Sequence, residues 1–135
     1  MATYNYGIDF PFSASGDLTA AQYRFVTQAG TAKRIIRSTG ASNPAPTGIL
    51  QNDPRSGEEA AVRYIGVSKV VGDAEGGAIA YGDWLTSGST GMAVVNTNGS
   101  SVAAMALEAL ASGSGVLIEC LLVPFGSGNK ADNVP

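Results

Sequence analysis

Turn-forming residues interrupt this chain so often that long helices have little room. Glycine occurs 18 times and proline 6 times among the 135 residues. Clusters of turn residues, such as Gly40–Gly48, Asn52–Gly57 and Gly72–Gly77, separate short apolar segments. Those segments are rich in Val, Ile, Tyr and Phe, which favour β-strands. We therefore expect an all-β protein, a small barrel or sandwich with about eight short strands and at most one short helix.

The predicted strands differ in how clearly the sequence defines them. Gln22–Thr27 and Ala32–Thr39 could pair as a hairpin, since only a short turn separates them. Gly66 interrupts the longest segment, Ala60–Val71, and indicates a bulge or bend. Val102–Ala111 stays open, because its composition favours a helix whereas its alternation favours a strand. The other predicted strands are Ile49–Gln51, Trp84–Leu85, Gly91–Thr97 and Val116–Val123.

The N-terminal segment has its own pattern. Large apolar residues occupy every second position, at Tyr4, Tyr6, Ile8, Phe10 and Phe12, with small or polar residues between them. A period of two predicts an extended conformation, and Pro11 restricts such a segment to the edge of a sheet. Two interpretations are open: these side chains cover the core of their own domain, or they dock on another chain. We expect an extended arm over residues 1–16, a β domain over 17–125 and a flexible tail over 126–135.

Composition excludes several classes of function. The chain has no histidine and one cysteine, so a Ser-His-Asp triad, a histidine-containing zinc site and a four-cysteine zinc site are all impossible. The net charge is −3 and no basic stripe is visible, which argues against a nucleic-acid partner. The segment with Lys33, Arg34 and Arg37 is interpreted as a solvated strand edge. No apolar run approaches the roughly 20 residues of a membrane helix, and no signal peptide is apparent.

The remaining candidates for chemistry are weak. Asp73 with Glu75, and Glu108 with Glu119, are interpreted as solvated carboxylates, so neither a metal site nor a glycosidase pair is expected. Cys120 lies in an apolar strand and is predicted to be buried and unreactive. Trp84 is predicted to belong to the core rather than to a ligand platform. We expect no enzyme activity and no cofactor.

Several segments resemble a family of small head proteins of tailed bacteriophages. The resemblance covers roughly residues 15–123. Its most specific piece is Leu50-Gln-Asn-Asp-Pro54, and weaker pieces are Gly82-Asp83 and Ala106-Leu107-Glu108. It also includes Leu18–Val26, Gly57–Val71 and Gly91-Met-Ala93. The family, once catalogued as a domain of unknown function, is associated with capsid decoration, also called cement or head stabilisation.

The resemblance implies a structural role on the virion. It implies a small β-barrel or β-clip-like domain that assembles as homotrimers on the outer surface of the capsid, at joints between capsomers. The partners would be the major capsid protein and further copies of this chain, after synthesis in the host cytoplasm. No contact motif transfers residue by residue, so the arm is assigned to capsid binding from its own alternation.

Two points are left open by these residues. The loop Asn52-Asp53-Pro54 is expected to fix a turn, with a direct capsid contact as the less favoured interpretation. A head-fibre base or a module that binds the host surface is the alternative function, since a similar barrel would serve it.

Overall fold

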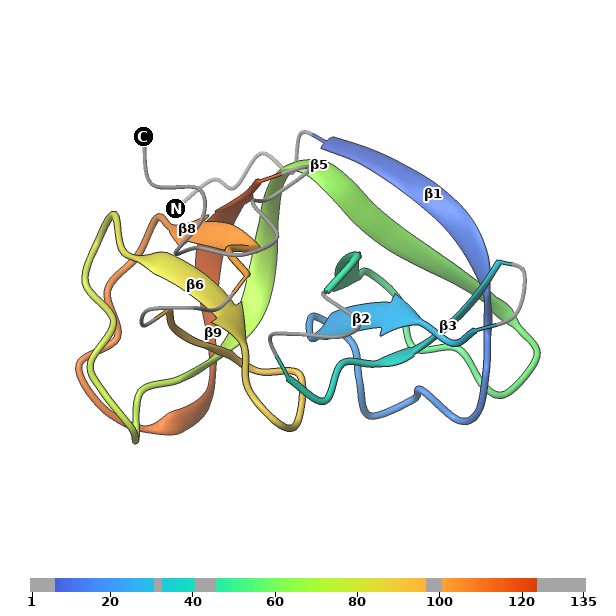
Figure 1. Ribbon diagram of the computed structural model, residues 1–135, viewed down its shortest axis with the longest axis horizontal. Helices are drawn as coiled ribbons and strands as arrows, with labels where there is room; N and C mark the ends of the chain where they lie inside the picture. The colour runs from blue at the N-terminus through green and yellow to red at the C-terminus, as the bar shows by residue number, and fades with distance from the viewer. Residues whose placement is uncertain (1–6, 31–32, 41–45, 97–100, 124–135) are drawn as a thin grey trace.

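The computed structural model describes residues 7–30, 33–40, 46–96 and 101–123, and the described residues contain strands but no helix (Figure 1). The all-β prediction is therefore confirmed. The strands are β1 (Gly7–Ala14), β2 (Phe25–Gln28), β3 (Arg34–Arg37), β4 (Gly48–Leu50), β5 (Glu59–Asp73), β6 (Trp84–Ser87), β7 (Ala93–Val95), β8 (Ala104–Ala106) and β9 (Ser114–Leu122).

All nine strands form one sheet, which closes on β5 from both ends. The strand order is β1-β3-β2-β4-β5-β7-β6-β8-β9, and additional pairings join β1 to β5 and β5 to β9. Ring one therefore consists of β1, β3, β2, β4 and β5, and ring two of β5, β7, β6, β8 and β9. Figure 1 shows them as two lobes on either side of β5. The sequence indicated a closed β architecture, but two rings with a common strand were not foreseen.

Gly66 marks the point where β5 passes from one ring to the other. It pairs with Gly7 of β1 and also with Leu122 of β9. The strand N-terminal to Gly66 pairs with β1, and the strand C-terminal to it pairs with β9. Gly66 has a φ of 111°, which side chains with a Cβ rarely adopt. The predicted irregularity is confirmed, since β5 changes its partner strand at Gly66 and the β1–β5 register shifts at Tyr64, two residues before this glycine.

Each ring encloses an apolar cluster. The ring-one cluster contains Ala14, Leu18, Ala21, Val26, Ile35, Leu50, Ala60 and Val62, with Phe12 packed against it. The ring-two cluster contains Val70, Ile79, Leu85, Ala93, Ala104, Ala106, Ile118, Cys120 and Leu122, together with Phe25 and Ile49. Because Phe25 and Ile49 come from β2 and β4 of ring one, the two rings pack directly against each other.

The local predictions are resolved as follows. The predicted hairpin is confirmed, since β2 and β3 pair antiparallel. The ambiguous segment Val102–Ala111 contains strand β8 and no helix. Ala104 and Ala106 face the core and pair with Leu122 and Cys120 of β9. Burial of alternate residues against a long partner strand therefore outweighs the helical composition of this segment.

Gly48 generates a prediction about stability. A Cβ at this position would collide with the carbonyl oxygen of Arg63 and lie 2.8 Å from Val62 Cγ1. We expect Gly48→Ala to lower the free energy of unfolding by about 3 kcal/mol or more, because β4 and β5 must separate to admit the methyl group. Urea unfolding measures this change. Gly76→Ala is the matched control, since no atom lies within 4 Å of a Cβ there; equal effects of the two substitutions would contradict the close approach.

Cys120 is fully buried, as predicted. Burial raises the pKa of its thiol to about 12, and the negative charge of Glu119 adds to the shift. In the unfolded chain the thiol ionises near its ordinary pKa of about 8.5. Above that pH the unfolded state loses a proton that the folded state keeps, so the stability falls as the pH rises.

The second prediction follows from this shift. The free energy of unfolding of the wild-type protein should fall, relative to that of Cys120→Ala, by up to about 1.4 kcal/mol per pH unit from about pH 9 to about pH 11. Urea unfolding of both proteins at several pH values measures the difference. A difference that stays constant over this range would show that the thiol ionises equally easily in both states.

Candidate functional site

The predicted arm is part of the sheet from Gly7 onward. Residues Gly7 to Ser13 of β1 pair antiparallel with β5, and Ser13 and Ala14 also pair parallel with β3. The segment is extended, as its alternation predicted, but these residues do not form a detached arm. The division of the chain at residue 16 stays a prediction. Tyr4 and Tyr6 lie outside the described residues.

Some side chains of β1 cover the core of their own domain, and others are exposed where they could dock on another chain. Phe12 packs against the ring-one cluster, so this end of the strand covers its own core. Phe10 is exposed and stacks on Tyr64, with ring centroids 5.5 Å apart. Ile8 is exposed opposite Ile65 of β5. Ile8 and Phe10 therefore remain available to a partner, and Phe12 does not.

Pro11 lies on an edge of the sheet, as expected. The amide of Ala14 donates to the Glu58 carbonyl on the β5 side, whereas the amide of Ser13 donates to Lys33 on the β3 side. Since backbone groups alternate along a strand, the nitrogen of Pro11 faces away from β5. Among the described residues β3 pairs with β1 only at Ser13 and Ala14, so the nitrogen that lacks a hydrogen faces no strand.

An ion pair fastens β1 to β5 where the two rings meet. The guanidinium of Arg63 donates from Nε to Asp9 Oδ1 at 2.6 Å and from Nη2 to Asp9 Oδ2 at 3.2 Å. Its Nη1 also donates to the carbonyl of Val67 at 2.9 Å, which spans the turn of the chain at Gly66. A bidentate pair of this kind fixes geometry as well as adding attraction. It holds Ile8 in place against Ile65.

The loop Asn52-Asp53-Pro54 is fixed largely by its own hydrogen bonds. Asn52 Nδ2 donates to the Glu59 carbonyl at 3.0 Å, and Asn52 Oδ1 accepts from the Ala61 amide at 3.0 Å. Pro54 is buried, and its carbonyl accepts from Leu18 at 2.9 Å. Asp53 is exposed. The structural interpretation of the loop thus accounts for Asn52 and Pro54, and Asp53 is the side chain that faces outward.

The other acidic candidates are held in local hydrogen bonds. Asp73 accepts from the Glu75 amide at 3.0 Å, and Glu108 accepts from the Glu119 amide at 2.8 Å. The part of the chain that the structure describes contains no cluster of three or more Cys, Asp or Glu that could hold a metal ion. It also contains no helix long and apolar enough to cross a membrane. Lys33, Arg34 and Arg37 are exposed, as predicted.

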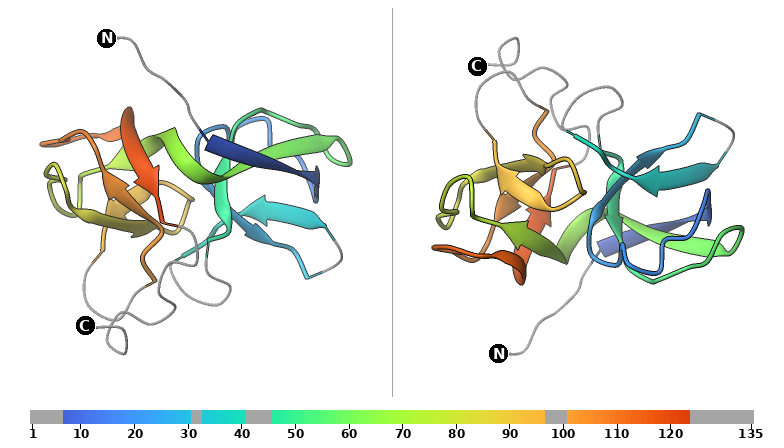
Figure 2. Two further views of the ribbon diagram at one scale, coloured as in Figure 1. Left: turned by 90° about the horizontal axis from the view of Figure 1, so that it is seen from above. Right: turned by 90° about the horizontal axis from the view of Figure 1, so that it is seen from below.

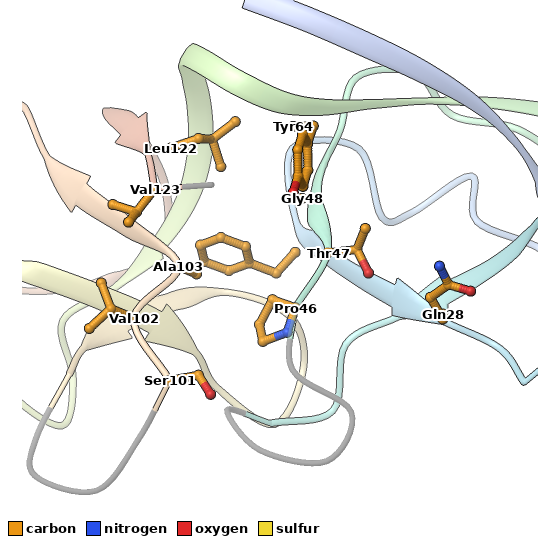
Figure 3. Close-up of a pocket in the computed structure, with 11 residues that line it drawn as sticks. Gln28, Pro46, Thr47, Gly48, Tyr64, Ser101, Val102, Ala103, Leu122 and Val123 are labelled. Atoms are coloured by element: carbon orange, nitrogen blue, oxygen red, sulfur yellow. The ribbon is translucent and has the colours of Figure 1, made fainter. Parts of the chain in front are cut away.

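A cavity of about 340 Å³ lies between the rings (Figure 3). Its lining is apolar and neutral polar, and none of the described residues around it is charged. None of the lining residues is a carboxylate, an imidazole or a thiol, which are the side chains that most often bind metals or transfer protons. The lining residues are Phe25, Gln28, Pro46, Thr47, Gly48, Tyr64, Ser101, Val102, Ala103, Leu122 and Val123.

Trp84 corrects one prediction from the sequence. It is about half exposed, because Leu85 is the residue of β6 that faces the ring-two core. Other exposed apolar residues were also missed: Ile65 in β5, Val116, Leu117 and Leu121 in β9, and Tyr81 before β6. In β5 and β9 the sequence carries apolar residues on both faces, so alternation could not identify the outward face.

Comparison with known proteins agrees with this picture of a structural domain. A solved structure, the head fiber gp8.5 N base of bacteriophage phi29, matches with a TM-score of 0.64 and 21% identity, covering 87% of this chain and 95% of that chain. No curated protein gives a significant match. The family model described as phage cement protein matches residues 1–122. This chain therefore belongs to the phage cement protein family and is a structural, virion-associated protein of the phage capsid.

Proposed function

We propose that this protein binds the outer surface of an assembled phage capsid, as trimers at joints between capsomers, and stabilises the shell. Its direct partners are the major capsid protein and other copies of itself. The observation that carries the proposal is the exposure of large apolar side chains on a tightly hydrogen-bonded sheet, in a chain from the phage cement family. The exposed side chains that we assign to the contact are Ile8, Phe10, Ile65, Trp84 and Leu121. Exposed apolar side chains that gather on one surface mark an interaction site on a protein domain.

Low charge supports a contact based on apolar burial. Charged residues make up 14% of the chain and its net charge is −3. Such a surface provides little electrostatic steering, so affinity depends on the apolar area covered. Three linked copies would bind together, because the first contact raises the effective concentration of the other two. A trimer that touches neighbouring capsomers would then oppose their separation.

The predicted contact residues enter this proposal unequally. Ile8 and Phe10 are exposed on β1 and form part of the contact, with Asp53 of the loop as a second element. Phe12 is assigned to folding, because it packs on the core. Tyr4 and Tyr6 belong to the contact on the strength of their alternation alone.

The trimer is tested by sedimentation equilibrium over a wide range of protein concentrations. We expect the mass of three chains in solution, or clusters of three on the shell if assembly needs the capsid surface. Cryo-electron microscopy of decorated capsids examines the second case. Isolated single copies on the shell, together with a monomer in solution, would contradict the proposal.

Stabilisation is tested by adding the purified protein to capsids that lack it. We expect the temperature at which the shell loses integrity to rise, and to stop rising once the surface sites are full. Light scattering during heating measures this temperature. An unrelated folded protein of similar size and net charge is the control for non-specific adsorption. If the capsid loses integrity at the same temperature when all its sites are occupied, the protein binds the shell but does not stabilise it.

A head-fibre base is the second candidate function. The similarity to the head fiber N base of phage phi29, which extends over 95% of that chain, favours it. A fibre base would anchor a projecting structure at a few positions, whereas a cement protein would cover many joints. Negative-stain images of virions with and without the protein distinguish the two by the loss of projections or by a change in the shell itself.

A further inference from the structure

Apolar side chains, four of them exposed and two half-buried, follow one another across both rings. In β-sheets, residues directly opposite each other on adjacent strands project from the same face. Trp84 of β6 pairs with Met105 of β8, and Met105 pairs with Leu121 of β9. Leu121 in turn pairs with Val67 of β5. These four residues therefore lie in a row across the outer face of ring two.

The row continues onto ring one. Ile65 lies two residues before Val67 on β5, across Gly66, and it pairs with Ile8 of β1. We call the complete set the apolar band: Trp84, Met105, Leu121, Val67, Ile65 and Ile8. Figure 2 (left) shows β9, β5 and β1 side by side across the molecule, seen from above. One surface feature thus includes strands from both rings.

Charge defines one limit of the band. The next outward pair along β5 and β9 is Lys69 opposite Glu119, and beyond it lies Val71 opposite Leu117. The band itself contains no charged residue. A partner that buried a charge against it would have to desolvate that charge without compensation. The matching surface is therefore apolar and uncharged.

The exposed area indicates which partner covers the band. The exposed fractions of the side chains are 50% for Ile8, 36% for Ile65, 47% for Trp84 and 38% for Leu121. A large side chain has a total surface of about 150–250 Å². Together these four residues therefore offer on the order of 300–400 Å² of surface to a partner. A stable interface between two free proteins buries about 800 Å² on each partner. The band is therefore too small to hold a free dimer, but it suffices for one contact among several on a lattice.

We propose that the apolar band is the surface that contacts the capsid, and that it lies on an uncharged apolar strip of the assembled capsid protein. This assignment rests on the proposed function and extends it, because the contact that includes Ile8 on β1 then continues over strands of both rings. The Arg63–Asp9 pair keeps Ile8 and Ile65 in register. Binding to such a preformed surface loses little conformational entropy.

The test compares substitutions on and off the band. Ile8→Ser and Trp84→Ser remove apolar area from its two ends. Leu117→Ser and Tyr81→Ser are matched controls, because these residues are 46% and 72% exposed but lie outside the band. Capsids lacking the protein are titrated with each variant, and occupancy is read from gels of pelleted capsids. Thermal unfolding and sedimentation of each variant are measured in parallel.

We expect each band variant to need about tenfold more protein for half-occupancy, and the double variant about a hundredfold more. The controls should stay within about twofold of wild type, with unfolding temperatures unchanged throughout. If a band variant unfolds, Leu121→Thr in the middle of the band replaces it. If the band variants occupy capsids as well as the wild type does, the assignment is overturned. It is also overturned if a band variant keeps its occupancy but changes its sedimentation mass, because a second copy of the chain would then be the partner that covers the band. Failure of the wild-type protein itself to bind would instead reject the proposed function.

Discussion

The pairing of β5 with β1 before Gly66 and with β9 after it is the interaction on which the rest of the structure depends. Without it each half of the chain would be an open sheet with unpaired backbone groups along two edges. With it, both halves close on the same strand, and the edges that remain are short. The fold therefore has two small cores, and β5 is long enough to contribute residues to both.

A second set of bonds keeps the rings from moving independently about β5. The amide of Phe25 donates to Gly91 at 2.8 Å, and the amide of Val71 donates to Tyr23 at 2.8 Å. Arg24 Nη1 donates to the Thr90 carbonyl at 2.9 Å. Together with the Phe25 side chain in the ring-two cluster, these bonds join ring one to ring two. A surface that crosses both rings is therefore held in one shape.

The sequence predicted what depends on local pattern. Alternation identified β1 as an extended segment, and it gave a strand as one of two interpretations for the segment that contains β8. The chemistry of proline placed Pro11 at an edge, and the apolar residues around Cys120 predicted its burial. The sequence could not predict the double closure, because the pairing of Gly66 with both Gly7 and Leu122 is set by packing between distant segments. It also misplaced Trp84. A residue with a large apolar side chain is expected inside, and only the register with Met105 shows that it projects outward.

The candidate site shows the same division. Period-two alternation found Ile8 and Phe10, because Gly7, Asp9 and Pro11 separate these large apolar residues from each other and from their neighbours. Ile65 and Leu121 escaped notice, since their strands carry apolar residues on both faces and give no sign of which face meets solvent. The ion pair of Asp9 could not be predicted either, because its partner Arg63 lies far along the sequence and is brought to Asp9 only by the pairing of β1 with β5. Recognition of the family came from short motifs, whereas the contact surface requires the assembled sheet.

The shared strand also has a consequence for how the chain folds. Gly7 and Leu122 each lie about 60 residues from Gly66, so both closing pairings join distant parts of the chain, and such pairings form slowly. Neither ring can close before β5 is in place, and ring two must also wait for β9 at the far end of the described chain. During synthesis β1 therefore emerges with its apolar face uncovered for some time. Pro11 then has a kinetic benefit, because a strand that cannot donate at one edge position is a poor template for pairing with other nascent chains.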